Sequence, residues 1–297
     1  MPRTGMLAEC VLNISEGRQI SVIDEAVAAG ADMVLDVHSD VVHNRTVLTL
    51  GGPLSSVEEA AHRVVGVAVA RIDLRRHEGV HPRFGAADVV PFVAPDSDWG
   101  RPPPKAVVAA RDRFAQWAGD HLELPCFLYG PERPLPDVRR SAFGTLRPDT
   151  GPPRPHLTAG ACAVGARPVL IAYNLWIGDR GETPGEAAAL PVARALAAGL
   201  RGADLRALGL AVEGGAQVSV NITGPAAMPI AALYDTVATG AQARGCWVER
   251  AELVGLVPAA VLHEAPRHRW TELDLGEDRT IEGRMAAKGY EVTTDRR

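Results

Sequence analysis

The chain is poor in cysteine and in aromatic residues, and it has no long hydrophobic run. Four of its 297 residues are cysteines, and aromatic residues make up 5%. No stretch of about 18 apolar residues is present, so we expect no membrane-spanning segment. The N-terminus, MPRTGMLAEC, lacks the basic and then apolar pattern of a secretory signal. These absences predict a cytoplasmic protein that does not bind membranes.

The few cysteines do not indicate a disulfide framework or a metal site. Cys10, Cys126, Cys162 and Cys246 each lie in an apolar run, and none belongs to a CxxC pair. Free cysteine is among the most buried residue types, and cytosolic thiols stay reduced. The sequence therefore predicts four reduced, buried thiols.

A basic segment is also missing. Lys and Arg total 31 against 36 Asp and Glu, and the formal net charge is −5. Nucleic-acid binding depends on neutralising phosphates, so we expect no nucleic-acid partner. Hydrophobic residues make up 46% and charged residues 23%, which is typical of a globular protein. The length suits two domains of about 150 residues each.

The order of apolar stretches predicts two similar α/β units. In the first part of the chain we expect strands at 6–12, 33–37, 45–50 and 126–129 and helices at 18–29, 55–72 and 105–121. In the second part we expect strands at 161–164, 169–175, 205–212, 216–222 and 247–253 and helices at 186–200 and 229–244. Two adjacent strands between two helices are typical of a split βαβ layout. The predicted fold class is α/β (α+β), with two ferredoxin-like α/β sandwich subdomains.

A stretch rich in proline and glycine at residues 144–160 is the best candidate for a domain boundary. We therefore expect an N-terminal subdomain at 1–146 and a C-terminal subdomain at 147–265. The remaining residues, 266–297, form a charged tail that we expect to be loosely packed or to serve as a partner surface.

Residues 77–81, His-Glu-Gly-Val-His, match the HExxH motif of zinc proteases. That motif needs a helix that places both histidines on one face beside the glutamate. Gly79 weakens a helix, and Pro82 disfavours the helical conformation of His81 directly before it. We therefore expect no metal site here.

The second interpretation of the same loop is acid–base chemistry at His81. Imidazole titrates near neutral pH, which suits proton transfer. Pro82 stiffens the backbone that follows, and Asp88 is near enough in sequence to orient the ring. Arg83 is a candidate to hold an anionic group of a substrate. Residues 79–95 resist regular assignment, and long irregular segments inside a compact domain tend to be functional.

Several motifs in one order resemble the formiminotransferase domain family. The resemblance covers about residues 7–262, with room for the transferase alone and none for a cyclodeaminase domain. The matching stretches are ECVLNISEG (9–17), HNRTV (43–47), ID (72–73), His77, HPR (81–83), DVVPF (88–92), PDTGP (148–152), GA (160–161), GAR (165–167), LIAYN (170–174), QVSVN (217–221) and LVGLVP (253–258).

The resemblance implies an enzyme that moves a formimidoyl group from N-formimidoyl-L-glutamate to N5 of tetrahydrofolate, in histidine degradation. It implies two subdomains with the ligand cleft between them, no metal, and a homodimer. His81 falls on the family's catalytic histidine and would be the general acid and base. For His77, four residues earlier, we expect a role in orienting the loop. The folate-binding segment falls on Gly151, Pro152, Pro153, Arg154, Pro155, His156, Leu157, Thr158, Ala159 and Gly160. A plain linker is the alternative interpretation of this segment.

The reaction needs groups for a cationic amidine and for the carboxylates of glutamate and folate. The expected substrate-binding residues are Asn13, His38, Arg45, Arg83 and Asp88. His38 and Val42 stand where related sequences often carry acidic residues. Two alternatives therefore stay open: the same fold and folate with a non-glutamate amine as donor or acceptor, and a folate-binding protein without turnover.

Overall fold

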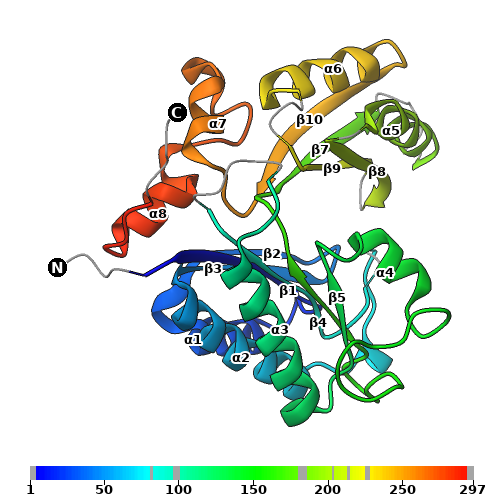
Figure 1. Cartoon of the computed structure of the whole chain (residues 1–297). Helices are drawn as coiled ribbons and strands as arrows, with labels where there is room; N and C mark the ends of the chain where they lie inside the picture. Colours follow the sequence, from blue (N-terminus) through cyan, green and yellow to red (C-terminus); the bar gives the residue numbers. More distant parts are fainter. Residues whose placement is uncertain are drawn as a thin grey trace. The chain divides into compact units, whose positions relative to one another are not determined.

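A computed structural model describes residues 5–80, 83–95, 101–179, 186–202, 204–212, 215–224 and 228–292. The chain forms two compact units, Met1–Pro168 with Met285–Arg297, and Val169–Arg284. Each unit has one sheet with helices packed against it (Figure 1). The predicted mixed α/β class with two α+β subdomains is confirmed.

The first unit contains a six-stranded sheet in the order β2-β3-β1-β4-β6-β5. Its elements are β1 (Leu7–Ile14), α1 (Ile20–Gly30), β2 (Val34–Asp40), β3 (Arg45–Pro53), α2 (Leu54–Arg71), β4 (Ala87–Val93), α3 (Lys105–Leu122), β5 (Cys126–Tyr129), α4 (Leu135–Ser141) and β6 (Cys162–Ala166). The first four strands are antiparallel and have the ferredoxin-like order, while β6 is parallel to both β4 and β5.

The core of this unit follows from alternation along the strands. Cys10 and Leu12 are fully buried and stand opposite Leu50 and Leu48 of β3. Helices α1, α2 and α3 cover this face of the sheet (Figure 1). The apolar residues of α2 recur at helical spacing and are buried. Burying one such side chain contributes about 1.5–3 kcal/mol, so this packing holds the sheet on which the loops stand.

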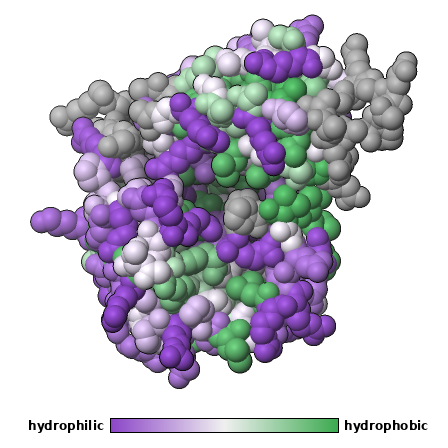
Figure 2. Space-filling model, turned by 90° about the vertical axis from the view of Figure 1, so that its right-hand side faces the viewer, coloured by the Kyte–Doolittle hydropathy of each residue, from purple (hydrophilic) through white to green (hydrophobic). Residues whose placement is uncertain are grey.

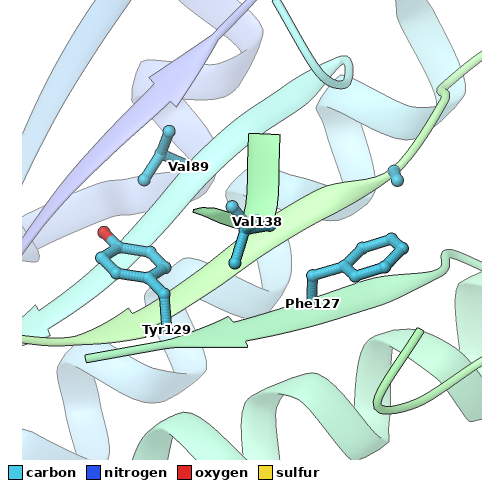
Figure 3. Close-up of a cluster of buried hydrophobic side chains, with 6 residues drawn as sticks. Val89, Phe127, Tyr129 and Val138 are labelled. Carbon is cyan, nitrogen blue, oxygen red and sulfur yellow. The ribbon is translucent and has the colours of Figure 1, made fainter. Parts of the chain in front are cut away.

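The opposite face of the β4–β6–β5 half is covered by α4. Val89, Phe127 and Tyr129 from the strands pack around Val138 of that helix (Figure 3). The rings of Phe127 and Phe143 meet edge to face, with centroids 5.0 Å apart. The sequence pattern predicts no helix here. Helix α4 has only seven residues and follows a proline-rich turn, so it is too short to show a clear helical periodicity.

The second unit has a four-stranded antiparallel sheet in the order β10-β7-β9-β8. Its elements are β7 (Ile171–Asp179), α5 (Glu186–Leu200), β8 (Leu205–Val212), β9 (Gly215–Ile222), α6 (Ile230–Gln242), β10 (Cys246–Val254) and α7 (Ala259–Glu264). The last described helix, α8 (Ile281–Ala287), begins in this unit and ends in the first. Helices α5 and α6 pack on this sheet. The order is again ferredoxin-like, as the element pattern predicts.

The units divide at Pro168, whereas the sequence places the domain boundary at 146/147. The reason is β6, expected as the first strand of the second unit. It pairs instead with β4 and β5, and all five of its residues are buried. A short continuous apolar run is typical of a central parallel strand, but it does not say which sheet the strand joins.

Residues 266–292 are also packed rather than loose. Leu273 and Ile281 are buried in the second unit, while Met285 and Tyr290 are buried as part of the first. A side-chain carbon at Gly52 would meet Met33 and the Tyr290 ring at 2.9 and 3.2 Å. Residues 266–292 of the tail are thus a structural element of the fold, although their composition is charged.

The surface and the thiols agree with the composition. The face in Figure 2 mixes hydrophilic and apolar residues. Within the described ranges, no helix is both long and apolar enough to cross a bilayer. All four cysteines are free and buried, which confirms the expectation for them. Burial raises the pKa of the Cys10 thiol, so this thiol stays protonated at neutral pH.

Candidate functional site

The ends of four strands meet at one edge of the six-stranded sheet. Strand β1 ends at Ile14, whereas β3, β4 and β6 begin at Arg45, Ala87 and Cys162. Because β1 is antiparallel to β3 and β4, and β6 is parallel to β4, these ends lie on the same side. The segments that precede or follow them, including residues 72–86 and 151–161, therefore gather there.

The loop after α2 begins with a short 3-10 helix at Leu74–Arg76 and continues without a helix. His77 is extended, with φ −92° and ψ 130°. The first histidine of the HExxH match is thus not helical, and His81 and Pro82 lie outside the described residues. Within the part of the chain that the structure describes, no three His, Cys, Asp or Glu side chains are grouped to hold a metal ion.

Asn44 ties this loop to the neighbouring turns. Its backbone has a left-handed φ of 47°, a conformation that asparagine tolerates better than most residues. The side-chain oxygen accepts from the Gly17 amide at 2.9 Å, and the side-chain nitrogen donates to the Glu78 carbonyl at 2.8 Å. One buried side chain therefore joins the β1–α1 turn to the loop. Nothing in the sequence spacing predicts this role.

The side chains of His77 and Arg83, which lie on either side of residues 81 and 82 in the sequence, are hydrogen-bonded to each other. His77 Nε2 lies 3.0 Å from the Asn44 carbonyl oxygen, and Arg83 Nη1 contacts His77 Nδ1. A carbonyl can only accept, so Nε2 carries the proton and Nδ1 accepts from the guanidinium. Burial and the Arg83 charge lower the pKa of His77, which favours this neutral form.

Asp88 is buried, and its partners hold the base of the loop. Its carboxylate accepts from the Phe84 amide and from Arg139 of α4, with Arg139 Nη2 at 2.5 Å. The sequence suggests that Asp88 orients His81; the partners that the structure describes for Asp88 are Phe84 and Arg139. A buried carboxylate with such an ion pair is costly to unpair, so Asp88 has a structural task here.

The expected folate segment folds back onto the same loop. His156 and Gly160 exchange two backbone hydrogen bonds of 2.7 and 3.0 Å, which closes a tight turn at its end. The Thr158 carbonyl accepts from the Leu74 amide and the Ala159 carbonyl from the Ala86 amide, both at 2.8 Å. The exposed residues of the segment are Gly151, Pro153, Arg154, Pro155 and Leu157, and Pro152 is half-buried.

Gly160 explains why this turn fits so closely. Its φ is +70°, and an added side-chain carbon would lie 2.7 Å from the Phe84 carbonyl oxygen. Only glycine adopts such a backbone at so close an approach without strain. The structure therefore brings the 83–88 and 156–160 segments together, although the sequence separates them widely.

Asn13 and His38 lie on one row across the sheet. Val47 of β3 stands opposite Asn13 on one side and opposite His38 on the other. Residues directly opposite one another point to the same face, so both side chains lie on the face away from α1 and α2. Arg45 is the first residue of β3 and stands opposite Asp40 of β2 in the register of the two antiparallel strands. These three residues belong to the β1–β3–β2 half of the sheet.

Two further residues of the β1–α1 turn belong to the site. The Ser15 hydroxyl donates to the Gly85 carbonyl at 2.8 Å, so Ser15 holds the loop. The Glu16 carboxylate accepts from the Arg18 and Gln19 amides at 2.8 and 2.9 Å, just before α1. Both belong to the ECVLNISEG stretch (9–17), whose resemblance to the family is the feature of the sequence that could have pointed to them.

Comparisons with known proteins identify the family to which the chain belongs. Residues 7–167 match the profile of the formiminotransferase domain, N-terminal subdomain, and residues 194–284 match that of the formiminotransferase domain. The chain belongs to the formiminotransferase family. It is therefore an enzyme, a transferase of the formimidoyl group.

Named members of the family match along most of the chain. The glutamate formimidoyltransferase of Streptococcus pyogenes serotype M1 is 34% identical over 282 residues, which cover 86% of this chain and 90% of that protein. The glutamate formimidoyltransferase of Thermoplasma acidophilum is 33% identical and covers 94% and 97%. The formimidoyltransferase-cyclodeaminase of Gallus gallus is 34% identical over 87% of this chain and 51% of its own length.

Proposed function

We propose that this formiminotransferase moves the formimidoyl group between N-formimidoyl-L-glutamate and N5 of tetrahydrofolate. Glutamate stands in the names of the two bacterial and archaeal relatives that match over nearly their whole length. The observation that carries the proposal is the joining of two segments by backbone hydrogen bonds. Residues 84–86, which follow the proposed catalytic histidine, bind Ala159 of the proposed folate segment and Ala161 directly after it.

We assign proton transfer to His81. The amine at N5 attacks the amidine carbon, and the bond from that carbon to the glutamate nitrogen then breaks. N5 loses one proton, and the departing nitrogen gains one, so a single imidazole can accept the first and donate it back. The described neighbours of His81 are held in place: the Val80 amide donates to the Val42 carbonyl at 3.4 Å, and Arg83 Nη2 donates to the Gly79 carbonyl at 2.6 Å.

The folate segment is proposed to contact the flat pterin. Its last residues are fixed to the loop, while Leu157 is 76% exposed at the tip of the turn. At its start, Thr150 directly before the segment is bound to Cys126 and Ala115. A segment that is anchored at both ends and has an exposed apolar tip can cover a planar ring without unfolding. This supports a binding role over a plain linker, because a linker would not need backbone bonds to Leu74 and Ala86.

In this proposal, residues of the β1–β3–β2 half of the sheet bind the charged groups of the substrates. A protonated formimidoyl group is an amidinium, and both substrates carry carboxylates, so the site needs polar groups and a cation. Asn13 and His38 offer polar atoms on one row of the sheet. Arg45, the first residue of β3 in the same half of the sheet, is the cation that we assign to a carboxylate.

The test is turnover with the purified full chain. Tetrahydrofolate and N-formimidoyl-L-glutamate are mixed with the protein, and formation of the N5-substituted folate is followed by absorbance. Turnover is the expected result. Turnover only with other formimidoyl amines would replace glutamate by another donor, and folate binding without turnover under any donor would refute the transferase proposal.

A further inference from the structure

We propose that Arg83 and His77 form a clamp that holds together the described residues on either side of His81 and Pro82, and that Arg83 is a positioning residue rather than a ligand for a substrate carboxylate. This inference rests on the role proposed for His81. It changes the task that the sequence suggests for Arg83, and it assigns a partner to His77.

The guanidinium of Arg83 closes the loop on itself. Nη2 donates to the Gly79 carbonyl at 2.6 Å, and Nη1 donates to the His77 carbonyl at 3.3 Å and to the His77 ring. These acceptors all precede the undescribed pair, and Arg83 directly follows it. A rigid planar fork that spans a loop in this way fixes the distance between its two stems.

His77 connects this closure to the sheet. Its ring binds Arg83 on one side and the Asn44 carbonyl on the other. Asn44 is in turn bound to Gly17 after β1, so the clamp is tied to two turns of the folded sheet. A loop fixed only to itself could still move as a body, whereas this loop is fixed to strands β1 and β3.

The space around the clamp is already filled. A side-chain carbon on Gly79 would lie 2.5 Å from the His43 carbonyl oxygen and 2.7 Å from Arg83 Nη2. Gly79 therefore allows the guanidinium to approach the backbone. The same glycine that breaks the helix of a zinc-protease motif here makes room for the arginine.

The charges around the ring agree with a neutral His77. Burial has the largest effect on the pKa of His77 and lowers it, and the Arg83 charge lowers it further, while the backbone of Asn44 and Ser15 and the Glu16 charge raise it; the net effect is a lowered pKa. A protonated ring would turn Nδ1 into a donor facing another donor, and the bond to Arg83 would be lost.

Positioning of this kind acts on the chemical step. A general base must lie within hydrogen-bond reach of the proton that it takes, and a misplacement of about 1 Å can lower the rate about 100-fold. A carboxylate ligand would act differently, because its loss weakens substrate binding and raises KM. The two tasks of Arg83 are therefore separated by kinetics.

The kinetic experiment compares Arg83→Met with Arg76→Met, a substitution of an exposed arginine in the same loop. The clamp predicts that Arg83→Met lowers kcat about 10- to 100-fold and changes the KM for formimidoylglutamate less than about threefold. Arg76→Met is expected to behave as the unchanged protein. A tenfold rise in KM with kcat preserved in Arg83→Met would overturn the clamp in favour of a substrate ligand.

Two substitutions at His77 separate its hydrogen bonds. His77→Asn places an acceptor near the position of Nδ1 and can keep the bond to Arg83. His77→Gln places a donor near the position of Nε2 and can keep the bond to Asn44. The clamp needs both bonds, so each variant is expected to have a kcat below that of the unchanged protein and above that of His77→Ala, which keeps neither bond. Equal kcat values in all three variants would contradict it.

Hydrogen exchange tests the clamp without turnover. Backbone amides of residues 78–86 are followed in the unchanged protein, Arg83→Met, His77→Ala and the double variant, with circular dichroism to confirm folding. Faster exchange in both single variants and no further increase in the double variant supports the clamp, whereas unchanged exchange overturns it. An unchanged protein that transfers no formimidoyl group would refute the proposed function, and exchange would still decide the clamp.

Discussion

The amide of Ala86 donates to the carbonyl of Ala159 at 2.8 Å. This one bond joins the loop that carries the proposed catalytic histidine to the segment proposed to bind folate. The Ala161 amide reinforces it by donating to the Phe84 carbonyl at 3.2 Å. The two segments are thus joined by backbone hydrogen bonds at the same end of the sheet, and a change in either is expected to affect the other.

Replacing His81 with alanine is expected to remove the acid–base step. The turnover rate should fall about 100- to 10,000-fold, the usual range for a positioned acid–base group. This corresponds to about 2.7–5.4 kcal/mol of activation free energy. Steady-state kinetics give the rate, while calorimetric titration with tetrahydrofolate and circular dichroism should show retained binding and fold.

His77→Ala serves as the control for that substitution, since it removes a neighbouring imidazole but no proposed proton carrier. Its rate should fall less than that of His81→Ala. Near-normal turnover in His81→Ala together with no turnover in His77→Ala would mean that the catalytic histidine is His77.

Binding of a reduced folate is expected to protect the turn at residues 156–160. Leu157 is 76% exposed, and thermolysin cleaves before such residues in accessible loops. Cleavage at the His156–Leu157 bond should slow when tetrahydrofolate is present at saturating concentration. The effect of tetrahydrofolate on cleavage at other sites in the chain serves as the control. Equal cleavage at this bond with and without ligand would place the folate at another site.

The regular elements follow from the sequence, but their long-range partners do not. Helix α3 was expected at residues 105–121 and is observed at Lys105–Leu122, because apolar residues at helical spacing carry that signal locally. Strand β6 has an equally clear apolar run, yet its sheet is decided by pairing with β4, many residues earlier. Periodicity says which face of an element is buried and not which neighbour buries it.

The candidate site shows the same division. Glycine and proline mark the loop around Gly79 in the sequence, since these residues disfavour regular structure. The hydrogen bonds of Asn44 depend on three turns that meet only in the folded unit. The ion pair of Asp88 with Arg139 likewise needs α4, a short helix that has no clear periodic signal.

Gly160→Ala is expected to destabilise the contact between loop and segment. Its φ of +70° is unfavourable for alanine, and the added carbon would press on the Phe84 carbonyl. We expect a loss of at least about 2 kcal/mol in the free energy of unfolding, or local release of the turn with a higher KM for folate. Denaturant unfolding and steady-state kinetics measure the two outcomes.

The matched control is Gly245→Ala. Gly245 also has a left-handed φ, of +75°, but an added carbon would meet nothing within 4 Å. Only the backbone strain of about 1 kcal/mol is expected there. If both variants lose the same stability, the close approach of Gly160 to Phe84 contributes nothing.

Metal removal is expected to leave activity unchanged. His77 is extended and bound to Asn44 and Arg83, so it does not present the helical geometry of a zinc protease. Elemental analysis of the purified protein should show no stoichiometric zinc, and incubation with a chelator should preserve turnover. One tightly bound zinc per chain, with activity lost on its removal, would overturn this prediction.

Acidification is expected to destabilise the first unit through His62. The ring of this α2 residue stacks on Trp117 and Phe114 of α3, with centroids 4.0 and 5.3 Å away. Burial lowers the pKa of His62, so the folded state binds a proton less readily than the unfolded chain. The stabilisation of neutral His62 is therefore complete above the ordinary pKa of about 6.5 and is lost as pH falls below it. His62→Phe keeps a stacked ring and cannot titrate. The drop in melting temperature between pH 7.5 and pH 5.5 should be smaller in this variant than in the unchanged protein, and an equal drop would show that His62 does not contribute.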